Sequence, residues 1–566
     1  MVLPTVVTLL YIILSFSVTS AWFDERARPP SFLDSVSLTQ RDLFDYGMTG
    51  LDINWGGPGT FIFGSARYSA WYAVGLLARN TNEDVKNANE LLHDVETEFD
   101  TESCYIEFLI KLFTDPSKIW FGTFKDAPDS PDPGDTWTPE IYSSYDPNQG
   151  LFVGTSFIII LEEFAELLDP SIKDLVKESL YNATVGDGYR NGGINGDNLY
   201  PVYSNPWFMR IMAATYAGNL MKDTNMSFWG DEWAREGIAA FDVYTTLPEY
   251  NCGTYNGVVL YALALWGYMP QNSTIVTRAA DLISKIWIDL AQYYNPTLGS
   301  LGPPWDRAYG YDMRNYFGIL GVQITGLIGG IANKTAPLPV PLVGSLHYGD
   351  AAIIPLLPII SKFHDPYVPK SVISQLKVLE EGQHFFAQAV SPPFDNVLYP
   401  RNYTSWKEPG LSVGGIEVDN QLVGGAAINP SVYVPASIMW RTPLGETAWI
   451  NHYPTSSVIS AIASSNSLAV SYPPSRAFTS NNTFSSTMSF LFSGHKHLTL
   501  HDDFLKSGSA ELPGLKLNVS GSLVGQKSTL RYIPDSIDGL SFYNLTYFIP
   551  QNFTEIPSVT LSFAKA

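Results

Sequence analysis

The sequence predicts an (α/α) toroid of helical hairpins followed by an antiparallel β-sandwich. Up to about residue 390, apolar runs of helical length recur and are interrupted by Gly, Asn, Asp and Pro. Beyond that point the chain consists of short runs rich in Val, Thr, Ser, Tyr and Phe, separated by turn residues. The chain has 566 residues, and since a domain averages about 150 residues, more than one domain is expected.

The N-terminus has the pattern of a secretory signal peptide. An apolar run from Val6 to Val18 precedes the small residues Thr19, Ser20 and Ala21, which predicts cleavage near Ala21 and a secreted, extracellular protein. The run is shorter than the roughly 20 residues that a membrane-spanning helix needs. No Lys or Arg precedes it, and an uncleaved membrane anchor is the alternative.

Nine Asn-x-Ser/Thr triplets without an intervening Pro support export and predict a glycoprotein. Their asparagines are Asn182, Asn225, Asn272, Asn333, Asn402, Asn481, Asn518, Asn544 and Asn552. The two cysteines, Cys104 and Cys252, are too few for a disulfide scaffold. One bridge between them and two buried free thiols are equally compatible with the sequence.

The helical region is organised as pairs of an inner and an outer helix. Runs long enough for helices occur at 207–222, 256–269, 275–293, 312–331 and 371–387. A mostly buried helix is followed by an amphipathic one across Asp169 and Pro170, and the next two pairs repeat this order. Inner helices start roughly 50 residues apart, which indicates stacked hairpins. A closed six-hairpin toroid is expected, with an open solenoid as the alternative.

The C-terminal region reads as strands, for example TMSFLFSG and SVTLSFA, with the lengths and spacing of a β-sandwich. The change of character falls within residues 389–404. The expected organisation is a signal peptide over 1–21, a catalytic toroid domain over 22–390 and a β-sandwich domain over 391–566.

Polar, Gly-punctuated turns run directly into the apolar helices, most clearly in NCGTYNGVVLYALALWGY at 251–268. Similar junctions occur at 65–80, 146–164, 203–218 and 305–330. Such a chain gathers aromatic and hydrogen-bonding side chains at one end of a helical array, where a carbohydrate cleft can form.

The loop over 299–312 contains several groups suited to a sugar acid. Trp305 could stack on a sugar face and Arg307 could grip a carboxylate, with Asp306 beside them. Tyr309, close to the guanidinium, could serve as a base or acid. The alternative is a structural turn in which Arg307 pairs with Asp306 or Asp312.

Two helix starts supply further candidates. Asn251 and Tyr255 lie at 249–257, and Asn205 lies in YSNPW at 203–207. The side-chain amides of Asn205 and Asn251 suit hydroxyl groups or a carboxylate. Helix capping by Asn251 and packing by Tyr255 are the alternative. His347, in a Gly-flanked turn, is a candidate base or positive charge, or else a capping or core histidine.

Cofactors are not expected. His495, His497 and His501 would share one strand face, but they lack the helical partner of a zinc motif, so no metal is predicted. No phosphate loop, dinucleotide fingerprint or G-x-S-x-G elbow is present. A net charge of −22 and a pI near 4.7 argue against nucleic acid and anionic membranes, and against long-range attraction of a polyanion. A glycan or small molecule is the expected partner.

Helical hairpins leading into an all-β region, with Asn, Tyr, Arg and His at the helix starts, resemble the toroid-plus-sandwich polysaccharide lyases, including the heparinase II/III-like group. The resemblance covers most of the mature chain and implies β-elimination on a uronide. It implies that Asn251 or Asn205, with Arg307, neutralises the substrate carboxylate. It further implies His347 as base, and Tyr255 or Tyr309 as base or acid.

Three other classes remain open. A glycoside hydrolase needs two carboxyl groups roughly 5–10 Å apart. Candidates for these are Asp197, Glu249, Asp306, Asp312 and Asp350. A secreted isomerase, dehydratase or cyclase would use the aromatic loops as a closed pocket. A non-catalytic glycan-binding protein is the third class.

Overall fold

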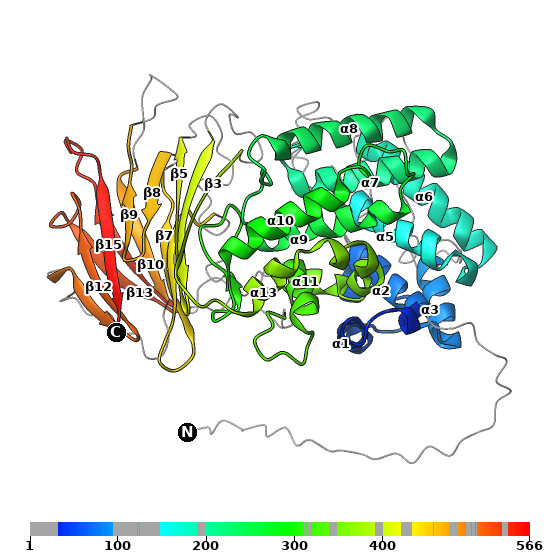
Figure 1. The fold of residues 1–566 in the computed structure, drawn as a ribbon, viewed down its shortest axis with the longest axis horizontal. Coiled ribbons are helices and arrows are strands. Elements are labelled where there is room, and N and C mark those ends of the chain that lie inside the picture. The colour runs from blue at the N-terminus through cyan, green and yellow to red at the C-terminus, as the bar shows by residue number, and fades with distance from the viewer. Residues whose placement is uncertain are drawn as a thin grey trace, which may run out of the picture.

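The computed structural model places the helices on one side of the molecule and the strands on the other (Figure 1). The described residues are 32–93, 122, 124, 146, 148–188, 199–308, 313, 318–338, 348–390, 400–419, 433–456, 458–474, 485–493, 500, 504, 507–534 and 541–566. The predicted fold class, a helical toroid followed by antiparallel β-structure, is confirmed. The expected signal peptide lies outside the described residues.

The helices form an inner ring with outer partners. They are α1 (Leu38–Asn54), α2 (Ala66–Arg79), α3 (Asn82–His93), α5 (Gln149–Glu163), α6 (Pro170–Gly188), α7 (Ser204–Met221), α8 (Thr224–Asp242), α9 (Gly253–Ala264), α10 (Ala279–Tyr293), α11 (Gly318–Ile328), α12 (Leu356–Ile360) and α13 (Lys370–Lys377), with a 3-10 helix η7 (Tyr348–Ile353) before α12. Each of α2, α5, α7, α9, α11 and η7 packs against the next, and η7 packs against α2. The ring is therefore closed.

Burial explains which helices lie inside. Helix α5 buries every residue from Gln149 to Ile160, whereas α8 buries one stripe with a spacing of mostly three or four residues. A helix that is apolar all round must be surrounded by other helices, and an amphipathic one can cover them from outside. Among the described helices, none combines the length and apolar character needed to span a membrane.

The strands form one large antiparallel sheet and a separate small pair. The small pair is β1 (Tyr294–Asn295) with β2 (Ser300–Leu301). The sheet comprises β3 (Gln383–Ala389), β4 (Arg401–Glu408), β5 (Leu411–Asp419), β6 (Ala436–Arg441), β7 (Thr447–Tyr453), β8 (Val458–Ala463), β9 (Ser467–Ser471), β10 (Thr487–Ser493), β11 (Ser509–Leu512), β12 (Leu515–Ser520), β13 (Ser528–Ile533), β14 (Phe542–Phe548) and β15 (Ser558–Lys565).

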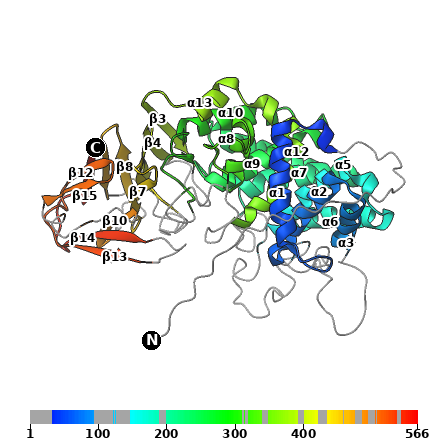
Figure 2. The ribbon, with the colours of Figure 1, turned by 90° about the horizontal axis from the view of Figure 1, so that it is seen from below.

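The sheet divides at β5 into two layers, and Figure 2 shows β12 and β15 apart from β10, β13 and β14. Residues 411–415 of β5 pair with β6, whereas residues 417–419 pair with β8. One layer continues through β7, β10, β14 and β13, and the other through β9, β15, β12 and β11. Gly415 stands at the division, where a Cβ atom would overlap the carbonyl group of Ala461 on β8. A residue without a side chain is needed there.

One predicted helix is shorter than expected. The run 371–387 was expected to be helical throughout, but α13 ends at Lys377 and the chain continues as strand β3 from Gln383. Between them, Gly382 passes so close to Trp406 that a Cβ atom would overlap the indole ring. Packing against β4, which is distant in sequence, therefore ends the helical segment. Strand β3, the first of the large sheet, therefore begins before the domain boundary expected near residue 390.

Polar contacts join the helices to the sheet. The Asn295 amide donates to the carbonyl oxygen of Glu408 at 2.9 Å. The buried ammonium of Lys407, on β4, donates to the carbonyl oxygens of Ala291 and Tyr294, at the end of α10. A cation at a helix C-terminus satisfies carbonyl groups that have no partner within the helix. The orientation of β4 relative to the helices is thereby fixed.

His452 should make stability depend on pH. Its Nε2 lies 2.9 Å from the Tyr472 hydroxyl in the core of the sheet, and burial lowers its pKa to about 3. An unfolded histidine binds a proton near pH 6.5, so this group contributes stability above about pH 6.5 that is lost as pH falls toward 3. Between neutrality and about pH 4.5 the wild type should lose about 2–3 kcal/mol more than His452→Gln, measured by urea denaturation. Equal losses in the two proteins would contradict this assignment.

Candidate functional site

Polar residues at the starts of the inner helices lie at one end of the toroid and contact one another. The Asn148 amide, before α5, donates to the Tyr203 hydroxyl, before α7, at 3.4 Å. At the start of α7, Asn205 donates from both its backbone and its side chain to Glu249, which precedes α9. Successive helix starts are thus linked at the polar end expected from the sequence junctions.

Arg67 extends this polar end to the start of α2. Its Nε donates to Gln149 Oε1 at 3.2 Å, and it forms ion pairs with Asp146 and with Asp350, the latter at 3.8 Å. The guanidinium also lies 3.9 Å from the centre of the Phe152 ring. A buried cation is stable only with such partners. Arg67 therefore holds α2, α5 and η7 together behind the candidate site.

Glu249 is a fully buried carboxyl group at the centre of these contacts. Its Oε2 accepts hydrogen bonds from Ser204 Oγ at 3.1 Å, Asn205 N at 3.0 Å and Asn205 Nδ2 at 2.8 Å. Burial raises the pKa of Glu249, while the Arg307 guanidinium and these hydrogen bonds oppose the rise. Asn205 is thus placed to orient the Glu249 carboxyl group, which interacts electrostatically with Arg307.

Asn251 and Trp305 are buried in the joint between the helices and the loop. The Asn251 amide donates to the carbonyl oxygens of Gly302 at 2.9 Å and Pro304 at 2.6 Å. Its backbone has a left-handed φ of 45°, which Asn tolerates better than most residues. Trp305 is fully buried and exchanges backbone hydrogen bonds with Val434. Both residues fix the loop in place and present no surface to a ligand.

Asp306 pairs with residues of the sheet. Its carboxylate accepts from Arg401 at 3.1 Å, from the Tyr403 hydroxyl at 2.9 Å and from the backbone of Tyr250 at 3.1 Å. The ion pair is almost fully buried. Sequence analysis missed Arg401 and Tyr403, which follow the loop by almost one hundred residues. Arg401 and Tyr403 are two residues apart and so share one face of β4. This spacing does not show which residue they contact.

Among the candidates that the structure describes, Tyr255 and Arg307 reach the surface. All residues of α9 except Tyr255 are buried, and Arg307 is half-buried. Tyr255 lies three residues after Cys252 at the start of α9, and Arg307 acts electrostatically on the buried Cys252 and Glu249. Tyr255 and Arg307 are therefore both partly exposed at this polar end.

The remaining predicted catalytic residues, Tyr309 and His347, lie outside the described residues. His495, His497 and His501 do so too. Within the described part of the chain, no group of three or more His, Cys, Asp or Glu is arranged to hold a metal ion. Cys252 is a buried free thiol, and Cys104 is outside the described residues.

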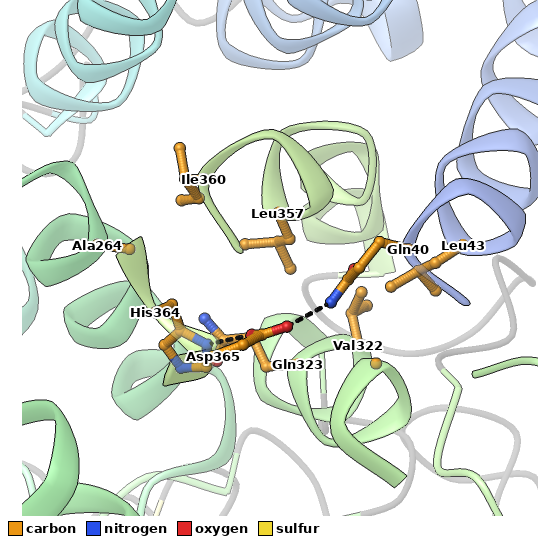
Figure 3. A pocket seen from close by; sticks show the side chains of 10 residues that line it. Gln40, Leu43, Ala264, Val322, Gln323, Leu357, Ile360, His364 and Asp365 are labelled. Atoms are coloured by element: carbon orange, nitrogen blue, oxygen red, sulfur yellow. Dashed lines mark hydrogen bonds and ion pairs between the residues drawn. The ribbon is translucent and has the colours of Figure 1, made fainter. Parts of the chain in front are cut away.

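A second polar cluster lies between α1, α11 and α12 (Figure 3). His364 Nε2 accepts from Trp287 Nε1 at 2.7 Å, so its proton is on Nδ1 and is donated to Asp365 at 2.9 Å. Gln40 donates to the other oxygen of Asp365 at 2.9 Å. The adjoining cavity, lined also by Gln323, has a volume of about 20 Å³ and admits about one water molecule. Both His364 ring nitrogens already make hydrogen bonds within the protein. The cluster therefore connects helices, and His364 is not assigned as a catalytic base.

Comparison with solved structures finds similar architectures at low identity. The chain is similar to a heparinase III, with a TM-score of 0.41 and 8% identity over 94% of this chain and 85% of that chain. It is also similar to a heparinase III with methylated lysines, with a TM-score of 0.33 and 9% identity over 94% and 85%. A third similar structure is that of a heparan sulfate lyase mutant from Pedobacter heparinus, with a TM-score of 0.29 and 9% identity over 96% of this chain and 85% of that chain. The resemblance is one of architecture.

Comparison with family models divides the chain as its secondary structure does. Residues 41–362 match a model described as a domain of unknown function, DUF8769, and residues 381–564 match another so described, DUF8770. No curated protein matches the chain. Since the first match spans more than half of the sequence, the chain belongs to the DUF8769 family.

Proposed function

We propose that this protein is an exported carbohydrate-active enzyme that cleaves a uronide-containing glycan by β-elimination. The observations that carry the proposal are that Tyr255, at the start of α9, is partly exposed and that Arg307, which acts electrostatically on the buried Glu249, is partly exposed too. The neighbouring Asn251, Trp305 and Asp306 are committed to internal contacts. A phenol beside a guanidinium suits proton abstraction next to a carboxylate, because the cation favours both anions.

The reaction assigns a distinct role to each group. Arg307 would bind the uronate carboxylate with two parallel hydrogen bonds and so acidify the adjacent C–H bond. Tyr255, as phenolate, would take that proton, and the electron pair would form the double bond as the glycosidic C–O bond breaks. The leaving oxygen takes a proton from a general acid. Tyr309 and His347 are further candidates for the acid or base.

Asn205 and Glu249 would act as positioning residues. Three hydrogen bonds hold one oxygen of the Glu249 carboxyl group. A fixed carboxyl group near Arg307 would orient the guanidinium before substrate binds, and such preorganisation raises rates by reducing the ordering needed at reaction.

A glycoside hydrolase is the second candidate. The raised pKa of the buried Glu249 is the observation that favours it, because a general acid must hold its proton near neutral pH. Asp306 is a weak choice for its partner, because that carboxylate is already neutralised by Arg401.

Export and N-glycosylation belong to the same proposal. The side chains of Asn225, Asn272 and Asn552 are exposed, which supports glycan attachment there. Asn402 is different, because its amide donates to Glu417 and accepts from Gln388. We expect a glycan at Asn402 to be absent, since it would disrupt both contacts.

Polysaccharide digestion distinguishes the two enzyme classes. The secreted protein is incubated with uronide-containing and neutral glycans, while ultraviolet absorbance and new reducing ends are recorded. Absorbance from an unsaturated uronide accompanies elimination, whereas reducing ends without that absorbance indicate hydrolysis.

Arg307→Lys tests the carboxylate contact. It should lower kcat/KM on a uronide roughly 10- to 100-fold, because an ammonium cannot reproduce a bidentate contact. Arg235→Lys, at an exposed pair with Glu232, is the matched control and should have little effect. Near-normal activity of Arg307→Lys would make Arg307 structural.

A further inference from the structure

An aromatic cluster, formed by Phe228, Trp229 and Trp233, lies on the outer surface of α8. Phe228 and Trp229 are 54% and 44% exposed, and their ring centres are 5.5 Å apart. Trp229 stacks on Trp233 at 6.1 Å, and Trp233 covers the buried Arg210 guanidinium at 4.5 Å. The rings are therefore supported from below, and their outer faces are open to a ligand.

A glycosylation triplet, Asn225-Met226-Ser227, lies one turn before the exposed rings. Residues three and four positions apart share a helix face, so Asn225 stands on the face of Phe228 and Trp229. Helical side chains lean toward the N-terminus, which directs both rings back toward Asn225. Asn225 is exposed. The helix cap Asp223 accepts a hydrogen bond from its backbone N–H, so the cap does not use the Asn225 side chain.

We propose that an N-glycan on Asn225 folds back on α8 and that its first N-acetylglucosamine packs against Phe228 and Trp229. This inference rests on the export and glycosylation in the proposed function. The apolar face of a pyranose presents C–H groups that an aromatic face attracts, and the distance of about one helical turn suits a sugar attached at Asn225. The glycan then covers apolar surface that would otherwise meet water.

The other exposed triplets provide an internal comparison. Asn272 is exposed, but no exposed large apolar residue among those described lies within four positions of it. The helical spacing that brings Asn225 and the exposed rings together is therefore absent at Asn272. Asn272 is therefore the matched control for Asn225.

The test is native deglycosylation of the secreted protein with a peptide N-glycosidase, followed by site-specific mass spectrometry. Release at Asn225 should be roughly 3- to 10-fold slower than at Asn272, because packing must be broken before cleavage. Trp229→Ala should remove the difference, whereas Trp229→Phe, which keeps a ring, should retain most of it. Circular dichroism confirms that both variants are folded.

Three outcomes overturn the inference: an unoccupied Asn225, equal release at the two sites, or slow release that persists in Trp229→Ala. In the second case the aromatic cluster is available for a free glycan or another protein. None of these measurements uses catalytic activity. A protein without glycans at any site would instead contradict the export proposal, so the two failures are distinguishable.

Discussion

Tyr255→Phe should lower turnover on a uronide substrate about 10²–10⁴-fold with a small change in KM, because it removes a general acid–base group but keeps the ring. Tyr255 is the one residue of α9 that is not fully buried, so the lost hydroxyl contributes little to the core. Steady-state kinetics of the secreted variant, followed by absorbance of the unsaturated product, measures the loss.

Tyr261→Phe is the matched control on the same helix. The Tyr261 hydroxyl is buried and lies 3.3 Å from Thr155 Oγ1, away from the accessible edge. Its removal should cost some stability and leave turnover nearly unchanged. If Tyr255→Phe kept full turnover, Tyr255 would not be the base. New reducing ends without unsaturated product, lost in Glu249→Gln, would refute elimination and favour hydrolysis.

The helical part of the fold could be predicted because its signals are local. The junction at 146–164 became α5, and the run at 256–269 became α9 with a short 3-10 helix after it. Both inner helices are apolar all round, and burial inside a ring demands that pattern. The end of α13 was mispredicted, because the close approach of Gly382 to Trp406 depends on a strand over twenty residues later.

The sheet was predictable as a type but not as a topology. Alternating burial along β12 reflects a period of two that the sequence displays. The division at β5 depends instead on which strand pairs with each half of β5. Pairing between distant segments has no local signature in the sequence. Sequence reasoning therefore reached a β-sandwich without its strand order.

The candidate site was predicted in part for the same reason. The sequence predicted polar side chains at helix starts, and the structure joins Asn205 to Glu249 and places Arg307 near them. It did not predict that Asp306 would be sealed against the sheet. Asp306 faces the second domain and not a cleft because Arg401 of β4 pairs with it. That pairing depends on a strand distant in sequence.

Asp306→Asn should lower the free energy of unfolding by about 3–5 kcal/mol, because it leaves the buried Arg401 guanidinium without a counter-charge. Urea denaturation followed by circular dichroism measures the change. Asp281→Asn, at a partly exposed pair with Lys285, is the control and should cost less than about 1 kcal/mol. Adding Arg401→Met to Asp306→Asn should recover part of the loss, since the unpaired charge is then absent. A stable, folded Asp306→Asn protein without activity would instead identify Asp306 as a catalytic carboxylate and support the hydrolase.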